Sequence, residues 1–255
     1  MSASRRSGVG PAAVGLAVCG LALAGCSTTQ DKSAALQRRA KAVDAPGKVA
    51  LGRPDPAVRV VGRKEVRTKA GTAVVVELQN TGPRALLRVP VALRLQAGGK
   101  QTYSNDGEGG DELLLRVPVL PPRGRVTWVN SNVPATTTDA KLEVIVGAPT
   151  RRSRRPAAAL RVSAVKRSTE DSGEDGVAVT GVVHNDLRRE QTEVPVYVTT
   201  RDGDELVAAA ATRIDTIAPR SSATFEAVLV GDGRRGRLAA EALPTKLQKT
   251  TRSSR

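Results

Sequence analysis

"RVPVALR", residues 88–94, returns later in the chain as "EVPVYVT", residues 193–199, and this repetition decides the fold. Just before these segments, "LQNTG" (78–82) and "VHNDL" (183–187) keep the same offset of 105 positions. A segment that recurs together with its neighbours at one fixed offset indicates that a whole unit of the chain has been copied.

A second pair of blocks gives the length of the repeated unit. "LPPRGRVTW" (120–128) matches "IAPRSSATF" (217–225), with an offset of 97. The difference of eight positions lies in the glycine-rich segment "GGKQTYSNDGEGGDE" (98–112), which is longer in the first copy. Collinear blocks with one insertion in a loop predict a duplicated domain.

Each copy has the pattern of short β-strands. The candidate strands are rich in Val, Ile and Thr or alternate apolar and polar residues, and they end at Asn, Gly or Pro-Arg turns. No amphipathic helix interrupts them, so the sequence predicts an all-β fold of two tandem antiparallel β-sandwich domains, residues 55–148 and 157–243. The predicted strands are 57–62, 72–80, 86–96, 125–133 and 141–147 in the first copy, and 159–165, 176–185, 192–200, 222–230 and 236–243 in the second.

The doubled Val-Pro-Val adds a detail to this prediction. Proline has no N–H to donate to a sheet ladder, so Pro90 and Pro195 are expected on an edge strand or at a bulge. Trp128 aligns with Phe225, which predicts a shared core position; exposure of Trp128 for binding is the alternative.

The second copy resembles the FxLYD family of bacterial immunoglobulin-like modules over about residues 157–238. The resemblance is carried by "VTGVVHN", "VPVYVTTRDGD" and "IAPRSSATFEA". It departs at the strand that names the family, where Val194, Val196 and Thr200 replace the aromatic residue and the Leu-Tyr pair. The first copy, with "VELQNTG", "LPPRGRVTW" and "DAKLEVIVG", is similar to small envelope lipoproteins that hold one such domain. Both resemblances imply immunoglobulin-like sandwiches outside the cytoplasm, and neither implies a reaction.

The N-terminus has the layout of a secretory signal peptide. Two arginines precede an uncharged run of Gly, Ala, Val and Leu, which small residues follow. Leu23-Ala24-Gly25-Cys26 resembles the lipobox of bacterial lipoproteins. The resemblance implies removal of residues 1–25, acylation of Cys26 and a lipid anchor on the extracytoplasmic side of the cell membrane. A retained membrane helix is the alternative. Cys19 lies in the removed part, so the mature chain would have one modified cysteine and no disulfide.

Three connecting segments complete the predicted organisation. Residues 26–54 form a flexible tether from the lipidated cysteine, and residues 244–255 form a basic disordered tail. Residues 149–156 form a linker between the domains that carries four arginines. These are candidates for anion binding, because a guanidinium group suits phosphate; a solvated spacer is the alternative. The four residues are Arg151, Arg152, Arg154 and Arg155.

The charge balance narrows the class of partner. The chain has 40 Lys and Arg against 25 Asp and Glu, and loss of the signal peptide would leave a net charge of +13. No basic motif with interleaved aromatic residues is present, and an exported protein does not meet the chromosome, so we expect no nucleic-acid partner. Anionic envelope polymers and lipid headgroups are the more plausible counterparts, unless the charge only aids solubility. Only four aromatic residues occur, which disfavours a sugar site built on stacking.

The sequence offers no constellation for catalysis or for a cofactor. His184 is the single histidine, at the predicted end of a strand, which leaves neither a Ser-His-Asp arrangement nor a transition-metal site. Two acidic loops, 105–112 and 169–176, could bind calcium, but they lack the spacing of an EF-hand loop. Calcium binding is therefore a minor alternative. We therefore predict no enzyme, no metal and no cofactor. The expected function is that of a membrane-anchored envelope lipoprotein that binds or scaffolds another envelope protein. The alternative is a structural tether for anionic cell-wall polymer or lipid phosphates.

Overall fold

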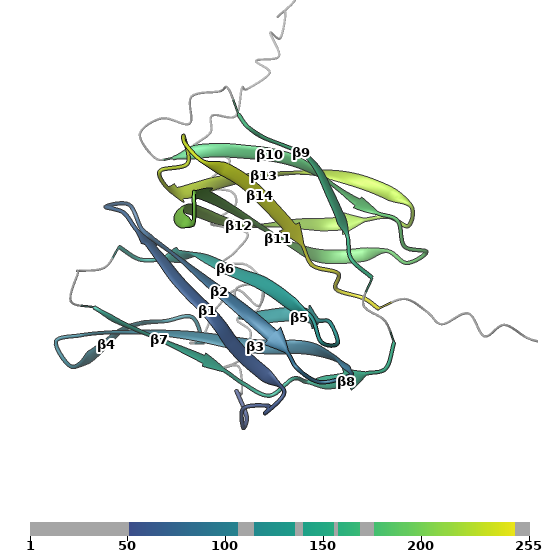
Figure 1. Cartoon of the computed structure of the whole chain (residues 1–255), viewed down its shortest axis with the longest axis horizontal. Helices are drawn as coiled ribbons and strands as arrows, with labels where there is room; N and C mark the ends of the chain where they lie inside the picture. The colour runs from purple at the N-terminus through teal and green to yellow at the C-terminus, as the bar shows by residue number, and fades with distance from the viewer. Residues whose placement is uncertain (1–50, 107–114, 136–139, 156–157, 169–175, 248–255) are drawn as a thin grey trace, which may run out of the picture. The chain divides into compact units, whose positions relative to one another are not determined.

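The computed structural model describes residues 51–106, 115–135, 140–155, 158–168 and 176–247 (Figure 1). In these residues all regular secondary structure is β-strand in antiparallel sheets, so the predicted all-β fold is confirmed. None of them forms a helix, and hence none forms one long and apolar enough to cross a bilayer. Cys26, with the predicted signal peptide and most of the tether, lies outside the described residues.

The first copy consists of two sheets. One has the order β1-β2-β6, and the other is centred on the long strand β3, which pairs with β4 and β5 on one side and with β7 and β8 on the other. The strands are β1 (Val58–Arg67), β2 (Thr72–Asn80), β3 (Ala85–Ala97), β4 (Lys100–Ser104), β5 (Arg116–Leu120), β6 (Arg125–Val133), β7 (Lys141–Val146) and β8 (Arg151–Ser153).

The second copy repeats this arrangement with fewer strands. β9, β10 and β13 pair in one group, β14, β11 and β12 pair in another, and a short β12–β13 pairing joins them. The strands are β9 (Arg161–Arg167), β10 (Val177–Asn185), β11 (Gln191–Asp202), β12 (Glu205–Ile217), β13 (Ser221–Gly231) and β14 (Arg237–Ala242).

The two copies share their pairing register residue by residue. Val76 lies opposite Trp128 in the β2–β6 pair, and the residues at the repeat offsets, Gly181 and Phe225, lie opposite each other in the β10–β13 pair. The backbone repeats as well, because Gly98 and Gly203 take nearly the same left-handed φ, 57° and 56°. The internal repeat of the sequence is therefore a repeat of local geometry.

The two prolines do not lie on edge strands, contrary to one of the two expectations. β3 and β11 both have partners on each side. Pro90 lies where the partner of β3 changes from β7 to β8, and Pro195 lies just beyond the last β11–β14 pair. At neither position does a neighbouring strand need a backbone N–H from this residue. Two residues earlier, Arg88 and Glu193 have φ values of 52° and 54°. These irregular positions, not an edge, accommodate the proline.

The insertion in the first copy divides one strand into two. β4 and β5 occupy the positions of the single strand β12. At the break, Asn105 Oδ1 accepts a hydrogen bond from the Leu93 N–H at 2.6 Å, and its Nδ2 donates to the Val91 carbonyl at 3.1 Å. The side chain of Asn105 thus pairs with the backbone of β3 where the chain leaves the sheet.

The copies pack against each other through sheet faces. Alternate residues of β12 point in opposite directions: Ala208 and Ala210 join the core of the second copy, whereas Ala209 joins the core cluster of the first. Tyr197 and Leu243 of the second copy belong to that first cluster too. Both copies lie within one compact unit, and β2 has almost no exposed surface because apolar neighbours cover both of its faces.

Candidate functional site

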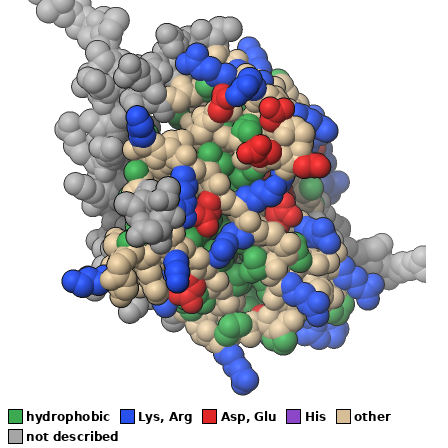
Figure 2. Space-filling model, turned by 60° about the vertical axis from the view of Figure 1, so that its left-hand side comes forward, with side chains coloured by type: hydrophobic (Ala, Val, Ile, Leu, Met, Phe, Trp, Pro, Cys, Tyr) green, Lys and Arg blue, Asp and Glu red, His purple; other side chains and the backbone are tan. Residues whose placement is uncertain are grey.

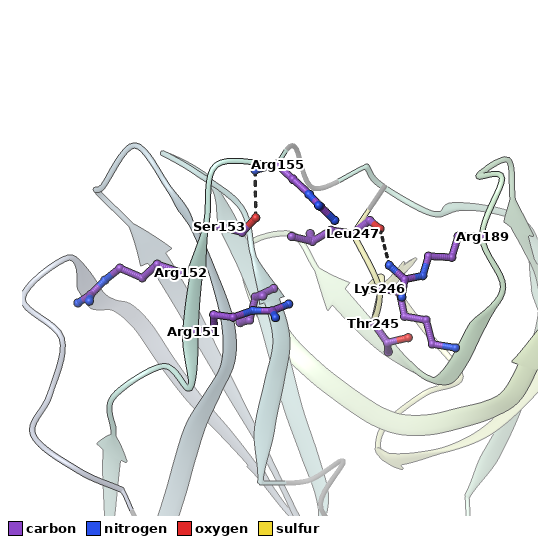
Figure 3. Close-up of a pocket in the computed structure, with 9 residues that line it drawn as sticks. Arg151, Arg152, Ser153, Arg155, Arg189, Thr245, Lys246 and Leu247 are labelled. Atoms are coloured by element: carbon purple, nitrogen blue, oxygen red, sulfur yellow. Dashed lines mark hydrogen bonds between the residues drawn. The ribbon is translucent and has the colours of Figure 1, made fainter. Parts of the chain in front are cut away.

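A basic pocket of about 350 Å³ lies where the first copy, the second copy and the C-terminal segment meet (Figure 3). We call it the junction pocket. Five of its lining residues are Lys or Arg, and none is Asp or Glu. The lining residues are Leu87, Arg151, Arg152, Ser153, Arg155, Arg189, Thr245, Lys246 and Leu247.

The first wall of the junction pocket comes from the segment predicted to be a linker. Residues 151–153 form β8, which pairs with residues 85–87 of β3. The first copy therefore extends beyond residue 148, because the open edge of β3 takes up this segment. Of the four predicted arginines, Arg151, Arg152 and Arg155 line the pocket, whereas Arg154 does not.

The opposite wall includes residues predicted to be a disordered tail. Pro244 and Leu247 are buried, and Leu247 packs with Ala85, Leu87 and Val119 of the first copy. The prediction is wrong for residues 244–247, because Leu247 finds an apolar cluster in the other copy. Residues 248–255 lie outside the described residues.

Gln191 fixes the backbone of Arg189 and Lys246 in this second wall. Its side chain is fully buried, and its Oε1 accepts hydrogen bonds from the backbone N–H groups of Thr245 and Lys246, each at 2.9 Å. Its Nε2 lies 3.2 Å from the Lys246 carbonyl oxygen and 3.3 Å from that of Arg189. The equivalent residue of the first copy is Leu86, beside which β8 continues the sheet. In the second copy, the side-chain amide of Gln191 forms hydrogen bonds to the backbone of residues 245 and 246 in place of a paired strand.

Arg189 itself is fixed by its turn and by the C-terminal segment. Asn185 Nδ2 donates to the Arg189 carbonyl at 3.0 Å, and Arg189 Nη1 donates to the Leu247 carbonyl at 3.3 Å. Its guanidinium is therefore directed toward the pocket from the turn between β10 and β11 (Figure 3). Sequence reasoning missed Arg189, Lys246 and Gln191; a polar Gln at a strand position where the other copy has Leu is the signal that was available.

The charges around the pocket are unevenly compensated. Arg152 points away from the other cations in Figure 3, and its Nη2 lies 2.6 Å from an oxygen of the buried Asp55. Lys246 Nζ lies 3.8 Å from Glu190. Arg151, Arg155 and Arg189 have no carboxylate partner among the described residues. On the face in Figure 2, by contrast, basic and acidic side chains are interspersed.

The remaining chemical groups give a weaker case for a site. His184 Nε2 and Ser163 Oγ lie 2.7 Å apart on neighbouring strands β10 and β9, and in the described part of the chain no carboxylate accepts a hydrogen bond from this histidine. The same part contains no cluster of three or more His, Cys, Asp or Glu suited to a metal. Most of the two acidic loops lies outside it. The junction pocket is therefore the candidate functional site.

Comparison with known proteins adds no further constraint. No model of a protein family matches the chain, and no curated protein matches it with significance. The function is accordingly argued from the residues and geometry of this chain.

Proposed function

We propose that this protein is a lipid-anchored lipoprotein of the bacterial cell envelope that acts, without catalysis, as a binding or scaffolding module. Cys26 in "LAGC" would hold it to the extracytoplasmic face of the cell membrane, on a tether that ends at about residue 54. The strands beyond the tether would present a preformed binding surface.

The observation that supports a binding role is that three arginines of the junction pocket, Arg151, Arg155 and Arg189, have no carboxylate partner among the described residues. Like charges brought together without acidic partners are unfavourable for folding alone, so their convergence favours an anionic ligand. Of the two partner classes expected from the sequence, the pocket favours the anionic envelope polymer.

An envelope protein is the second candidate, supported by a different observation. β1 lies at the edge of its sheet, and Val60 and Val61 on it are 46% and 40% exposed. An exposed edge with apolar side chains suits the addition of a strand from a partner protein.

Fractionation of cells tests the anchor. The wild-type chain should enter the membrane fraction and carry label from radioactive palmitate, whereas Cys26→Ser should lose both. Cys19→Ser is the matched control, because that residue lies in the segment predicted to be removed. Soluble, unlabelled wild-type chain would contradict the proposal.

Cross-linking in intact cells, followed by mass spectrometry, tests the partner class. Cross-links to wall polymer that disappear at moderate salt indicate an anionic partner, because screening weakens such contacts. One dominant protein that survives the same salt indicates the second candidate. Cross-links to neither would contradict a binding role.

A further inference from the structure

We propose that the junction pocket binds a phosphate group of a phosphodiester polymer, and that the bound phosphate fastens the C-terminal segment 244–247 to the first copy. This inference rests on the proposed function and names the ligand of the same site.

The first step concerns the direction of the cationic groups. Arg151 and Arg155 reach the pocket from the β8 side, whereas Arg189 reaches it from the second copy (Figure 3). The Lys246 ammonium points away from Arg151 and Arg155 and lies 3.8 Å from Glu190. A carboxylate has two oxygens in one plane, but a phosphate offers acceptor oxygens in several directions. Donors on two facing walls therefore fit phosphate better. Ser153 also lines the pocket, and its hydroxyl, which accepts a hydrogen bond from the Arg155 N–H at 3.0 Å, has an O–H to donate without adding charge.

The second step concerns preorganisation. Gln191 fixes the backbone of Lys246 and of Arg189 through hydrogen bonds of 2.9–3.3 Å, and its side chain is buried. Because the walls are held before a ligand arrives, binding costs less conformational entropy.

The third step distinguishes a polymer from a membrane surface. The cations line a recess, and the two apolar lining residues, Leu87 and Leu247, are each only 8% exposed. A flat bilayer makes poor contact with a recess, and the lining offers no exposed apolar side chain that would insert into lipid. A chain with single phosphates along it places one of them in the pocket.

The last step links binding to the C-terminal segment. Lys246 and Leu247 belong to that segment, and Leu247 packs on the first copy. Arg189, whose Nη1 donates to the Leu247 carbonyl at 3.3 Å, faces Arg155 across the pocket. A phosphate between these two guanidinium groups would replace repulsion across the junction by attraction. Binding should therefore raise the melting temperature and should be weakened when Leu247 is lost.

Calorimetric titration of the full chain carrying Cys26→Ser tests the proposal at low salt, with inorganic phosphate, a glycerol-phosphate oligomer and acetate as probes. We expect the oligomer to bind most tightly and acetate at least about tenfold more weakly than phosphate. Arg155→Gln and Arg189→Gln should each weaken phosphate binding about tenfold, the effect of losing one charged hydrogen bond.

The chain supplies matched controls beside each test position. Arg154→Gln and Arg188→Gln remove the same charge one residue away, outside the pocket lining, and should change affinity less than twofold. Equal losses in all four variants would overturn the proposal, because they would indicate general attraction to a basic surface. Absence of binding by phosphate and by the oligomer would overturn it too.

Two further measurements test the positioning and the source of the phosphate. Gln191→Leu introduces the residue that the first copy has at this position, and it should weaken phosphate binding without any change of charge. Circular dichroism reports whether the strands persist. Unchanged affinity in a folded variant would contradict the positioning role. Stronger binding to phosphatidylglycerol vesicles than to the oligomer would overturn the choice of polymer. Membrane retention through Cys26 is measured in a separate experiment. A failure of phosphate binding would therefore not count against the proposed lipid anchor.

Discussion

Asn80 and Asn185 have the same set of hydrogen bonds at equivalent strand ends. In the second copy, Asn185 Nδ2 lies 2.9–3.0 Å from the carbonyl oxygens of Arg189, Ile217 and Ala218, and its Oδ1 accepts from the Leu187 N–H at 3.2 Å. In the first copy, Asn80 bonds to the equivalent groups. The asparagine was recognised from the sequence as a turn residue, but its role in joining three backbone segments follows only from the folded chain.

Asn185→Ala should lower the free energy of unfolding by more than ~2 kcal/mol, because several backbone groups would be buried without a partner. Urea denaturation followed by circular dichroism measures this loss. Asn132→Ala, at an exposed position, should stay within ~0.5 kcal/mol of the wild type. An equally small effect of Asn185→Ala would contradict the role assigned to this side chain.

Trp128 is fully buried, as its alignment with Phe225 predicts. Trp128→Ala should cost ~3–5 kcal/mol through the cavity that it leaves. Trp128→Phe should cost far less, because the second copy carries Phe at this position and Trp128 Nε1 has no hydrogen-bond acceptor in the described residues. Denaturation followed by circular dichroism compares the two variants. A loss below ~1 kcal/mol for the alanine variant would contradict a stabilising core role for this ring.

At the scale of elements, the ten strands predicted from β-branched residues or alternation correspond to observed strands, whereas β4, β5, β8 and β12 were not predicted. β2 and β6 coincide with the predicted ranges, and the other predicted strands overlap observed ones. β12 was missed because "LVAAAATRI" is rich in alanine, which has low strand propensity. Small side chains suit β12 because each of its faces is covered, so tertiary packing overrides local preference there. β8 was also missed because tertiary packing decides its structure: residues 151–153 become a strand by pairing with the open edge of β3.

Glu241 of β14 faces β6 of the first copy, and the contact should depend on pH. Its Oε2 accepts a hydrogen bond from the Thr127 N–H at 3.2 Å, and burial raises its pKa, an effect that the bonds from Thr127 partly oppose. The folded chain therefore holds this proton more tightly than the unfolded chain. The contribution of Glu241 to stability should be fully present below the usual carboxylate pKa and should be lost as pH rises through the raised pKa.

Glu241→Gln removes this titration and keeps an acceptor for Thr127. Relative to the variant, the wild type should lose stability as pH rises from the usual carboxylate pKa through the raised pKa of Glu241, which urea denaturation at several pH values measures. Glu226→Gln, on the exposed side of β13, is the control and should follow the wild type. Parallel pH profiles for Glu241→Gln and the wild type would contradict the effect of burial.

At the scale of the molecule, the residues of the junction pocket could be predicted from the sequence only in part. The sequence indicates the arginines of residues 151–155 because four of them lie within five positions, and their guanidinium groups suit an anion wherever they lie. Arg189 and Lys246 lie far from them along the chain and carry no pattern of their own. The packing of the second copy and of Leu247 on the first copy brings them to the same pocket.

That packing predicts that the two copies unfold together. Tyr197, Ala209 and Leu243 of the second copy belong to the apolar cluster of the first, so unfolding of one copy exposes apolar surface of the other. Trp128, the single tryptophan, reports on the first copy by fluorescence, whereas circular dichroism reports on both. The two denaturation curves should coincide.

Ala209→Asp tests the cause of this coupling, because it places a carboxylate in the shared cluster without a partner. We expect the two curves to separate, with circular dichroism showing a second transition that tryptophan fluorescence does not follow. Ala239→Asp, the same change at an exposed position of β14, should leave the curves coincident. Two separate transitions in the wild type would mean that the shared cluster does not couple the copies, and the junction pocket would then open whenever the less stable copy unfolds.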